Sequence, residues 1–376
     1  MKKISFALVL VIMLYAGTAA AEDWPAFRKD AEHSGESAVL LQPPLKIKWE
    51  FTIPDKIISS PSVYRGKVYV GARDNALYCI DARKGSLCWK FKTGGWVDAS
   101  AAVTDDAVYV SSRDGNLYCL SAEKGENIWT YHTGGTDCAS PLVAGGKVFC
   151  ASGFPNNYIY ALDAVTGKEL WRYETQQMVY SSPALFGDNI YIGSNDGYIY
   201  CLDKNSGALV WKYQTRGGIY LSSPSLRDYH LFIAAGDFDW AVYALKTDSG
   251  KEWWKYEFSD RQPTPNYVSN VAAGNGVIFV VAGYEKQFLY CLNTAGALQW
   301  KAALGPAARF GFASSACVTK DIVYVSSANG ILNAFEITTG ALKWQYGLEA
   351  GVLSSPCVAD GILYVATLKG TVYAFE

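Results

Sequence analysis

A glycine followed four residues later by a tryptophan recurs along this chain at nearly constant spacing. The seven copies are Gly85–Trp89, Gly125–Trp129, Gly167–Trp171, Gly207–Trp211, Gly250–Trp254, Gly296–Trp300 and Gly340–Trp344. Together with Trp49, which lacks the preceding glycine, the successive tryptophans lie 40 to 46 residues apart. A period of this length is the size of one four-stranded β-propeller blade, so the repeat predicts an all-β chain that folds as one closed unit.

The repeat over residues 179–214 shows the expected strands most clearly, at 179–185, 189–193, 198–202 and 208–214. Asn195-Asp196-Gly197 is a tight hairpin signal between the second and third strands. Gly207 supplies the positive φ that ends the next turn. The tryptophan at this offset, which is Trp211 here, falls on the same sheet face in every repeat. There it can fill the wedge between neighbouring sheets.

The two ends of the chain complement each other. The last segment, 353–375, has a Ser-Ser-Pro start and two further strands, but the chain stops before any tryptophan. The N-terminal segment 45–52 carries Trp49 without the rest of a repeat. We therefore expect eight four-stranded blades, with the N-terminal strand completing the C-terminal blade, because closure removes the open edge of an unfinished sheet array.

The N-terminus has the pattern of a secretory signal over residues 1–21: Lys2 and Lys3, an apolar run, and small residues before Glu22. Residues 22–44 form a leader expected to pack on the ring, and 45–376 form the propeller. No Cys follows the apolar run, so we expect no lipid anchor and an exported, periplasmic or extracellular, soluble ring that is monomeric. Signal removal changes the formal net charge from −2 to −4, which argues against nucleic acid as a partner.

Nine cysteines are an odd number for an exported chain. Four of them occupy one repeat slot, which indicates small buried side chains in a strand rather than a disulfide framework: Cys79, Cys119, Cys201 and Cys291. Cys79 and Cys88 lie on one expected hairpin, and the sequence leaves open whether they pair, because a disulfide demands a close Cβ separation.

The segment 161–171, Ala-Leu-Asp-Ala-Val-Thr-Gly-Lys-Glu-Leu-Trp, resembles the tryptophan-docking repeat of the PQQ-like, or quinoprotein-type, propeller family. Residues 23–28 with Asp30, His33 and Gly35 are similar to the leader of exported members. One branch, the quinoprotein dehydrogenases, implies pyrroloquinoline quinone (PQQ) and calcium over the channel mouth. The other, the BamB-like outer-membrane assembly propellers, implies a scaffold that binds a partner through its loops.

The short hairpins and uninterrupted blades resemble the BamB-like branch more closely in size and style. No Cys-Cys pair, long insertion or repeated acidic cluster is present to suit the dehydrogenase machinery, so we expect neither PQQ nor calcium. The three histidines lie on separate segments, and no nucleophile elbow or phosphate loop occurs, so we expect no catalytic residues.

Strand order places the fourth-to-first and second-to-third loops at one end of the ring, and these loops vary between repeats. Aromatic and arginine side chains at a ring mouth favour binding of a peptide, strand or sugar. The partner-binding candidates are Trp96, Tyr180, Tyr220, Trp240, Arg261, Tyr267, Arg309 and Phe310. The alternative for each ring is that it caps the core of a blade.

The hairpin Asp237-Phe238-Asp239-Trp240 has two interpretations. Trp240 could form a stacking floor for a ligand, with the two aspartates binding a cation, or the hairpin could be structural with the ring packed on its neighbour. The sequence as a whole favours a non-enzymatic scaffold that binds a protein or peptide partner, with envelope protein assembly as the setting that the BamB-like resemblance implies. The alternatives are a quinoprotein-type oxidoreductase using PQQ and calcium, and a small-ligand or carbohydrate-binding propeller.

Overall fold

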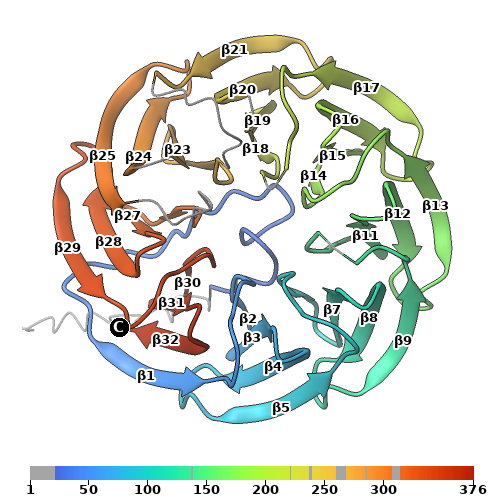
Figure 1. The fold of residues 1–376 in the computed structure, drawn as a ribbon, viewed down its shortest axis with the longest axis horizontal. Coiled ribbons are helices and arrows are strands. Elements are labelled where there is room, and N and C mark those ends of the chain that lie inside the picture. The colour runs from blue at the N-terminus through green and yellow to red at the C-terminus, as the bar shows by residue number, and fades with distance from the viewer. Residues whose placement is uncertain are drawn as a thin grey trace, which may run out of the picture.

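The computed structural model describes residues 22–136, 139–220, 222–236, 239–259, 268–283, 286–306 and 314–376. Within these residues the strands form eight four-stranded antiparallel sheets arranged in a ring (Figure 1). The predicted eight-bladed all-β propeller is therefore confirmed. The described residues contain no helix long and apolar enough to cross a membrane. Residues 1–21, the expected signal, lie outside the described residues.

The blades are numbered along the chain, and each runs outward from the ring axis in strand order. Blade 1 has β2 Ser62–Tyr64, β3 Lys67–Ala72, β4 Ala76–Asp81 and β5 Leu87–Lys92; blade 2 has β6 Ala102–Val103, β7 Ala107–Ser112, β8 Asn116–Ser121 and β9 Asn127–His132. Blade 3 has β10 Leu142–Ala144, β11 Lys147–Ala151, β12 Tyr158–Asp163 and β13 Glu169–Glu174; blade 4 has β14 Ala184–Phe186, β15 Asn189–Gly193, β16 Tyr198–Asp203 and β17 Leu209–Gln214. Blade 5 has β18 Ser225–Arg227, β19 His230–Ala235, β20 Ala241–Lys246 and β21 Glu252–Glu257; blade 6 has β22 Ala272–Gly274, β23 Val277–Ala282, β24 Lys286–Asn293 and β25 Leu298–Pro306. Blade 7 has β26 Cys317–Val318, β27 Ile322–Ser326, β28 Ile331–Glu336 and β29 Leu342–Gly347; blade 8 has β30 Cys357–Ala359, β31 Ile362–Ala366, β32 Thr371–Phe375 and β1 Ile47–Thr52.

Blade 8 closes the ring by joining the two ends of the chain. β1 pairs antiparallel with β32, with Trp49 opposite Ala374 and Thr52 opposite Thr371 (Figure 1). The backbone N–H groups of Lys46 and Glu376 also donate to each other's carbonyls, at 2.8 and 2.9 Å. The expected closure by the N-terminal strand is confirmed, and the outer edge of β32 is covered.

In blade 4 the outer three strands agree closely with the sequence prediction, but the first strand does not. We expected it over 179–185, whereas β14 begins at Ala184. The preceding backbone is committed to the next blade, since the Ser182 N–H donates to Ser223 Oγ at 2.9 Å. Pro183 has no N–H to offer a sheet ladder. The inner strand is therefore shorter than its apolar pattern suggested.

The recurring tryptophans join each blade to the next. In seven blades the indole N–H donates to a carbonyl of the following blade, as Trp171 does to Lys204 at 3.1 Å. The other six donors are Trp49, Trp89, Trp129, Trp211, Trp254 and Trp300. The glycine of the next blade's turn lies directly on the ring: a Cβ on Gly207 would be 2.6 Å from Trp171 Cδ2. The glycine is thus required both by its φ of +71° and by this close packing.

The leader crosses the inside of the ring (blue in Figure 1) and bonds to the inner strands of several blades. Its carbonyls accept backbone N–H bonds of 2.7–2.8 Å from five inner-strand residues. These donors are Val63, Val103, Leu185, Leu226 and Val318, from blades 1, 2, 4, 5 and 7. One segment therefore ties together inner edges that belong to separate blades.

Two buried polar side chains hold the leader in place. Arg28 is 2% exposed, and its guanidinium donates to the carbonyls of Ala316 at 2.6 Å and Val271 at 3.2 Å. His33 is 3% exposed, and its Nδ1 lies 3.0 Å from the carbonyl of Pro224, so the ring donates from that nitrogen. Burial lowers the pKa of His33 to about 3 and that of Arg28 to about 10. His33 is consequently neutral at physiological pH.

The cysteine slot is buried as the repeat indicated, with Cys79, Cys119, Cys201 and Cys291 at 1% exposure or less. Cys79 and Cys88 are both free thiols in this structure, the first buried and the second exposed. Burial raises the pKa of Cys79 to about 12.

Candidate functional site

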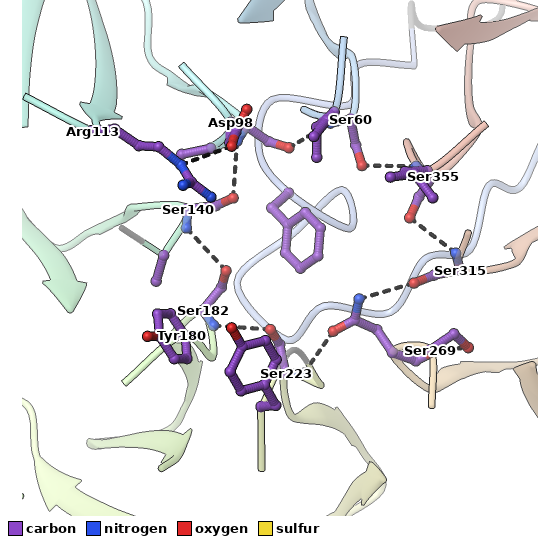
Figure 2. A pocket seen from close by; sticks show the side chains of 18 of the residues that line it. Ser60, Asp98, Arg113, Ser140, Tyr180, Ser182, Ser223, Ser269, Ser315 and Ser355 are labelled. Atoms are coloured by element: carbon purple, nitrogen blue, oxygen red, sulfur yellow. Dashed lines mark hydrogen bonds and ion pairs between the residues drawn. The ribbon is translucent and has the colours of Figure 1, made fainter. Parts of the chain in front are cut away.

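A closed circle of hydrogen bonds surrounds the ring axis at the start of the inner strands (Figure 2). In six of the eight bonds a serine backbone N–H donates to the hydroxyl oxygen of the serine in the next blade, as Ser60 does to Ser100 at 2.9 Å. The circle runs through Ser60, Ser100, Ser140, Ser182, Ser223, Asn270, Ser315 and Ser355 and returns to Ser60, with bonds of 2.6–3.2 Å. In blade 6 the Asn270 side chain accepts from Ser223 and donates to Ser315. We call these eight residues the serine ring.

The leader lies beneath the serine ring. In five blades an inner-strand backbone N–H donates to a carbonyl of the leader. In each of these blades the donating residue lies three positions after the serine of the serine ring, as Val63 lies after Ser60. Three extended residues span about 10 Å. Phe27 of the leader lines the space above. The leader therefore closes the axis on the side of the first-to-second turns.

Above the leader is a cavity of about 660 Å³ lined by all eight serine-ring residues and by residues of the fourth-to-first and second-to-third loops. Its volume is in the usual range for small-ligand sites. The described lining contains three cations, Lys56, Arg73 and Arg113, and one acid, Asp98. With one negative and three positive groups, the formal charge of this lining is +2, opposite in sign to the −2 of the whole chain.

The charged residues form a cluster around Trp96, which comes from the loop between blades 1 and 2. The Arg73 guanidinium donates twice to Asp98, at 3.1 and 3.0 Å, and Arg113 Nε lies 2.9 Å from the same carboxylate. Both guanidiniums also lie over the Trp96 ring, at 4.3 and 5.3 Å from its centroid. Trp96 stays 42% exposed. The Trp96 cluster, meaning Trp96, Arg73, Arg113 and Asp98, thus presents at the mouth an aromatic ring and two guanidiniums that share one carboxylate.

An aromatic pair lies on another part of the wall. Tyr180, from the loop after blade 3, and Tyr220, from the loop after blade 4, have ring centroids 4.6 Å apart. Both line the cavity, and Figure 2 shows Tyr180 beside the serine ring near Ser182. Residues from four successive blades therefore meet at one mouth.

Three of the sequence candidates, Trp96, Tyr180 and Tyr220, lie at or beside this cavity. Arg261, Tyr267, Arg309 and Phe310 lie outside the described residues. Lys56, Arg73 and Arg113 were not among the candidates. The sequence does contain a pattern that could have identified the two arginines. Arg73-Asp74 and Arg113-Asp114 are Arg-Asp pairs at the same position of the hairpin between the second and third strands in adjacent blades.

Trp240 does not fit the interpretation as a stacking floor. It is 1% exposed and belongs to the apolar core between blades 5 and 6, next to Phe258. Its φ of +51° turns the chain sharply at this position. The structural interpretation of the hairpin is the one that agrees with this burial, and Asp237 and Phe238 lie outside the described residues.

Asp239, in the same hairpin, is committed to contacts within the protein. Its carboxylate accepts from Lys255 Nζ at 2.8 Å, from the Tyr243 hydroxyl at 2.5 Å and from the Arg216 backbone N–H at 2.9 Å. Asp114 and Asp196 accept the equivalent backbone N–H in their blades, from Gly94 at 2.7 Å and Gln176 at 3.0 Å. The hairpin aspartate is therefore an inter-blade contact rather than a cation ligand.

Comparison with known families places the chain among propellers. Residues 31–261, more than half of the chain, match the family described as "Beta-alanine-activating enzyme, beta-propeller". The chain belongs to this β-propeller family. Residues 285–376 match the family described as "Outer membrane protein assembly factor BamB". The resemblance to PQQ-like, BamB-like repeats is thereby confirmed.

Individual relatives agree with this assignment. The outer membrane protein assembly factor BamB of Yersinia pestis is 29% identical over 132 residues, which are 32% of this chain and 31% of the relative. The match thus spans about a third of that protein. The structure of BamB from Moraxella catarrhalis is similar with a TM-score of 0.73 and 17% identity, covering 88% of this chain and 99% of that one. Quinohemoprotein alcohol dehydrogenase from Comamonas testosteroni gives a TM-score of 0.80 at 18% identity, covering 94% and 80%. At these identities the solved structures show the fold alone.

The dehydrogenase likeness raises the question of whether the cavity suits calcium and a quinone cofactor. Calcium takes about six to eight oxygen ligands, commonly including carboxylates. Asp98 is the single acid in the described lining, and two arginines already bind it. Across the described ranges, no three or more His, Cys, Asp or Glu residues gather in a way that could hold a metal ion. The donor set of this cavity does not match that of a calcium site.

Proposed function

We propose that this protein is an exported, non-enzymatic scaffold whose channel-mouth face binds a segment of a protein partner in the cell envelope. The observation that carries the proposal is the cavity itself, closed below by the leader and open among the variable loops. Its mouth offers Trp96, Tyr180 and Tyr220 together with arginines, the side-chain types that anchor protein interfaces most strongly. The partial match to outer membrane protein assembly factors supports the envelope setting.

Site-specific photo-crosslinking tests which face binds. A photoreactive amino acid is placed at Tyr180 in one variant and at Val165 in a matched control, and each is irradiated in cells. Val165 is 79% exposed and lies in the turn between the third and fourth strands of blade 3. We expect position 180 to capture a discrete protein and position 165 to capture none. Capture from position 165 but not from 180 would place the partner on the opposite face and contradict the proposal.

We further propose that the cavity works without PQQ and calcium, because its described donor set holds one carboxylate that two guanidiniums already bind. Calorimetric titration of the purified mature protein with PQQ in the presence of calcium tests this, alongside a dye-linked alcohol oxidation assay. We expect no stoichiometric heat and no turnover. Stoichiometric binding with turnover would favour the oxidoreductase alternative.

A further inference from the structure

The inner part of the channel-mouth cavity is surrounded by hydroxyl groups. All eight residues of the serine ring line the cavity, and Figure 2 shows the labelled serines arranged around the axis. The seven serines of the ring are 1–8% exposed. Each of their hydroxyl oxygens accepts one N–H bond within the ring, from Asn270 Nδ2 at Ser315 and from a backbone N–H at the others. The ring thus gathers seven buried hydroxyl groups around one hollow.

These hydroxyl groups keep hydrogen-bonding capacity beyond the ring. A hydroxyl has one O–H donor and two acceptor lone pairs, and the bond within the ring uses one of the lone pairs. In the part of the chain that the structure describes, no protein group accepts the O–H of these serines: Ser60, Ser100, Ser140, Ser182, Ser223, Ser315 and Ser355. Buried polar groups without partners cost free energy. The hollow therefore suits an occupant whose groups both accept and donate hydrogen bonds.

An aromatic ring of the leader lies at the base of the hollow. Phe27 lines the cavity and is half-buried. Its ring packs edge-to-face on His33, with the ring centroids 5.4 Å apart and the planes at 83°. His33 is itself held by its bond to the carbonyl of Pro224. The base of the cavity is therefore an apolar surface in a fixed position, below a circle of hydroxyl groups.

A sugar ring combines the two matching features. One face of a pyranose presents C–H groups, which can pack on an aromatic ring, and hydroxyl groups stand around its edge. Each of these hydroxyl groups both donates and accepts, as the serine hydroxyls do. A carboxylate or a peptide carbonyl would accept from the serines but donate nothing to their remaining lone pairs. The cavity volume of about 660 Å³ is in the usual range for small-ligand sites.

From these features we infer that the inner part of the cavity binds a saccharide, with one sugar ring over Phe27 and its hydroxyl groups bonded to the serine ring. The leader closes the axis below, so the sugar enters from the mouth as a free molecule or as the end of a glycan. The inference goes beyond the proposed function, because this ligand lies deeper than the loops assigned to the protein partner and needs no partner to bind.

Saturation-transfer NMR with the purified mature protein tests the inference. The probes are disaccharides of glucose, galactose, mannose and N-acetylglucosamine. The controls are sorbitol, which has hydroxyl groups but no ring to lie over Phe27, and glutarate, which only accepts. We expect at least one disaccharide to bind about 10-fold or more tightly than sorbitol and not to be displaced by glutarate. Binding of no disaccharide, equal binding of sorbitol, or displacement by glutarate would overturn the inference.

A substitution at the base of the cavity tests the contact with the sugar ring. Phe27→Leu keeps an apolar side chain but removes the aromatic face, so it should weaken disaccharide binding about 2- to 10-fold. Phe186→Leu is the matched control, because Phe186 is also half-buried and packs edge-to-face, on Tyr229 at 5.3 Å, but does not line the cavity. Undiminished binding in Phe27→Leu, or the same loss in both variants, would contradict the assigned position of the sugar.

Two neighbouring serines provide a matched pair for the hydroxyl contacts. Ser60→Ala removes a cavity hydroxyl and should weaken disaccharide binding about 2- to 10-fold. The Ser59 hydroxyl is already bonded to the N–H and the carbonyl of Gly71, both at 2.9 Å, and does not line the cavity. Ser59→Ala should therefore leave binding unchanged in protein that retains its melting temperature. Equal affinities of the two variants would show that the serine ring does not hold the sugar.

Photo-labelling locates the sugar without any substitution. A diazirine-bearing form of the disaccharide that binds is irradiated with the parent protein, and the labelled peptides are identified by mass spectrometry. We expect labels at residues 26–28, 58–60 or 98–100, which approach the axis on the leader and in two blades. Labels confined to other segments would refute the site. If no disaccharide binds while position 180 still crosslinks to a protein in cells, the saccharide inference fails and the proposed function stands.

Discussion

At the scale of single residues, the glycine of each Gly–Trp repeat serves two purposes, and only one of them is visible in the sequence. Gly207 has a φ of +71°, which a turn explains. It also lies against Trp171 of the preceding blade, so closely that a Cβ would be 2.6 Å from the ring. The contact joins residues 36 positions apart, and a motif read within one repeat does not show it.

A pair of glycines in blade 4 separates the two purposes. Gly187 has a φ of +62° with nothing within 4 Å of an added Cβ, so Gly187→Ala should cost only the backbone penalty, about 1 kcal/mol. Gly207→Ala should cost about 1–3 kcal/mol more, because the Trp171 ring must move. Urea unfolding of the two variants measures the difference. Equal shifts of the midpoint would show that the tryptophan contact adds nothing.

At the scale of elements, the leader acts as a structural part of the ring. It bonds to inner strands of five blades and buries Arg28 and His33 among backbone carbonyls. The sequence indicated a leader through its resemblance to exported propellers. It did not indicate the common register, three residues below the serine ring, because that register depends on how separate blades meet at the axis.

The leader should make stability depend on pH through His33. Burial lowers the pKa of His33 to about 3, whereas the unfolded chain has a His pKa of about 6.5. Between these values the unfolded chain binds a proton that the folded protein excludes, so stability falls as the pH falls from about 6.5 toward 3. The stability of the parent relative to His33→Gln should decrease in this window, by up to about 1.4 kcal/mol per pH unit.

Denaturant unfolding at several pH values measures this difference. His132→Gln is the control, since His132 is exposed at the end of β9. A difference between parent and His33→Gln that stays constant from pH 7 to pH 4 would contradict the account of a buried, neutral imidazole.

At the scale of the whole molecule, the ring could be predicted from the sequence more completely than the site. The tryptophan spacing and the complementary ends determine eight blades and the β1–β32 closure, because both follow from repeats along the chain. The Trp96 cluster could not be assembled in the same way, since Arg73 and Arg113 meet only when two blades are placed side by side. The sequence left open whether Trp240 faces a ligand or packs on its neighbour, because an irregular hairpin allows both, and in the structure its ring is 1% exposed in the core between blades 5 and 6.

Closure also determines which faces remain for binding. The leader occupies the axis below the serine ring, and the cavity opens among the loops that differ most between blades. The hydrogen bonds of the serine ring repeat from blade to blade, whereas the side chains of the loops above it differ between blades. Both features are consistent with a scaffold that presents one binding face.

Hydrogen exchange of the mature protein, alone and with the partner identified by crosslinking, tests whether the channel-mouth face binds the partner. It needs no substitution, because it reports on backbone amides along the whole chain. We predict that the partner slows exchange of backbone amides at the cavity mouth, including Val97 and the segment 178–180. Protection confined to the opposite turns, such as residues 163–167, with no change at the mouth, would contradict the claim that the channel-mouth face binds the partner.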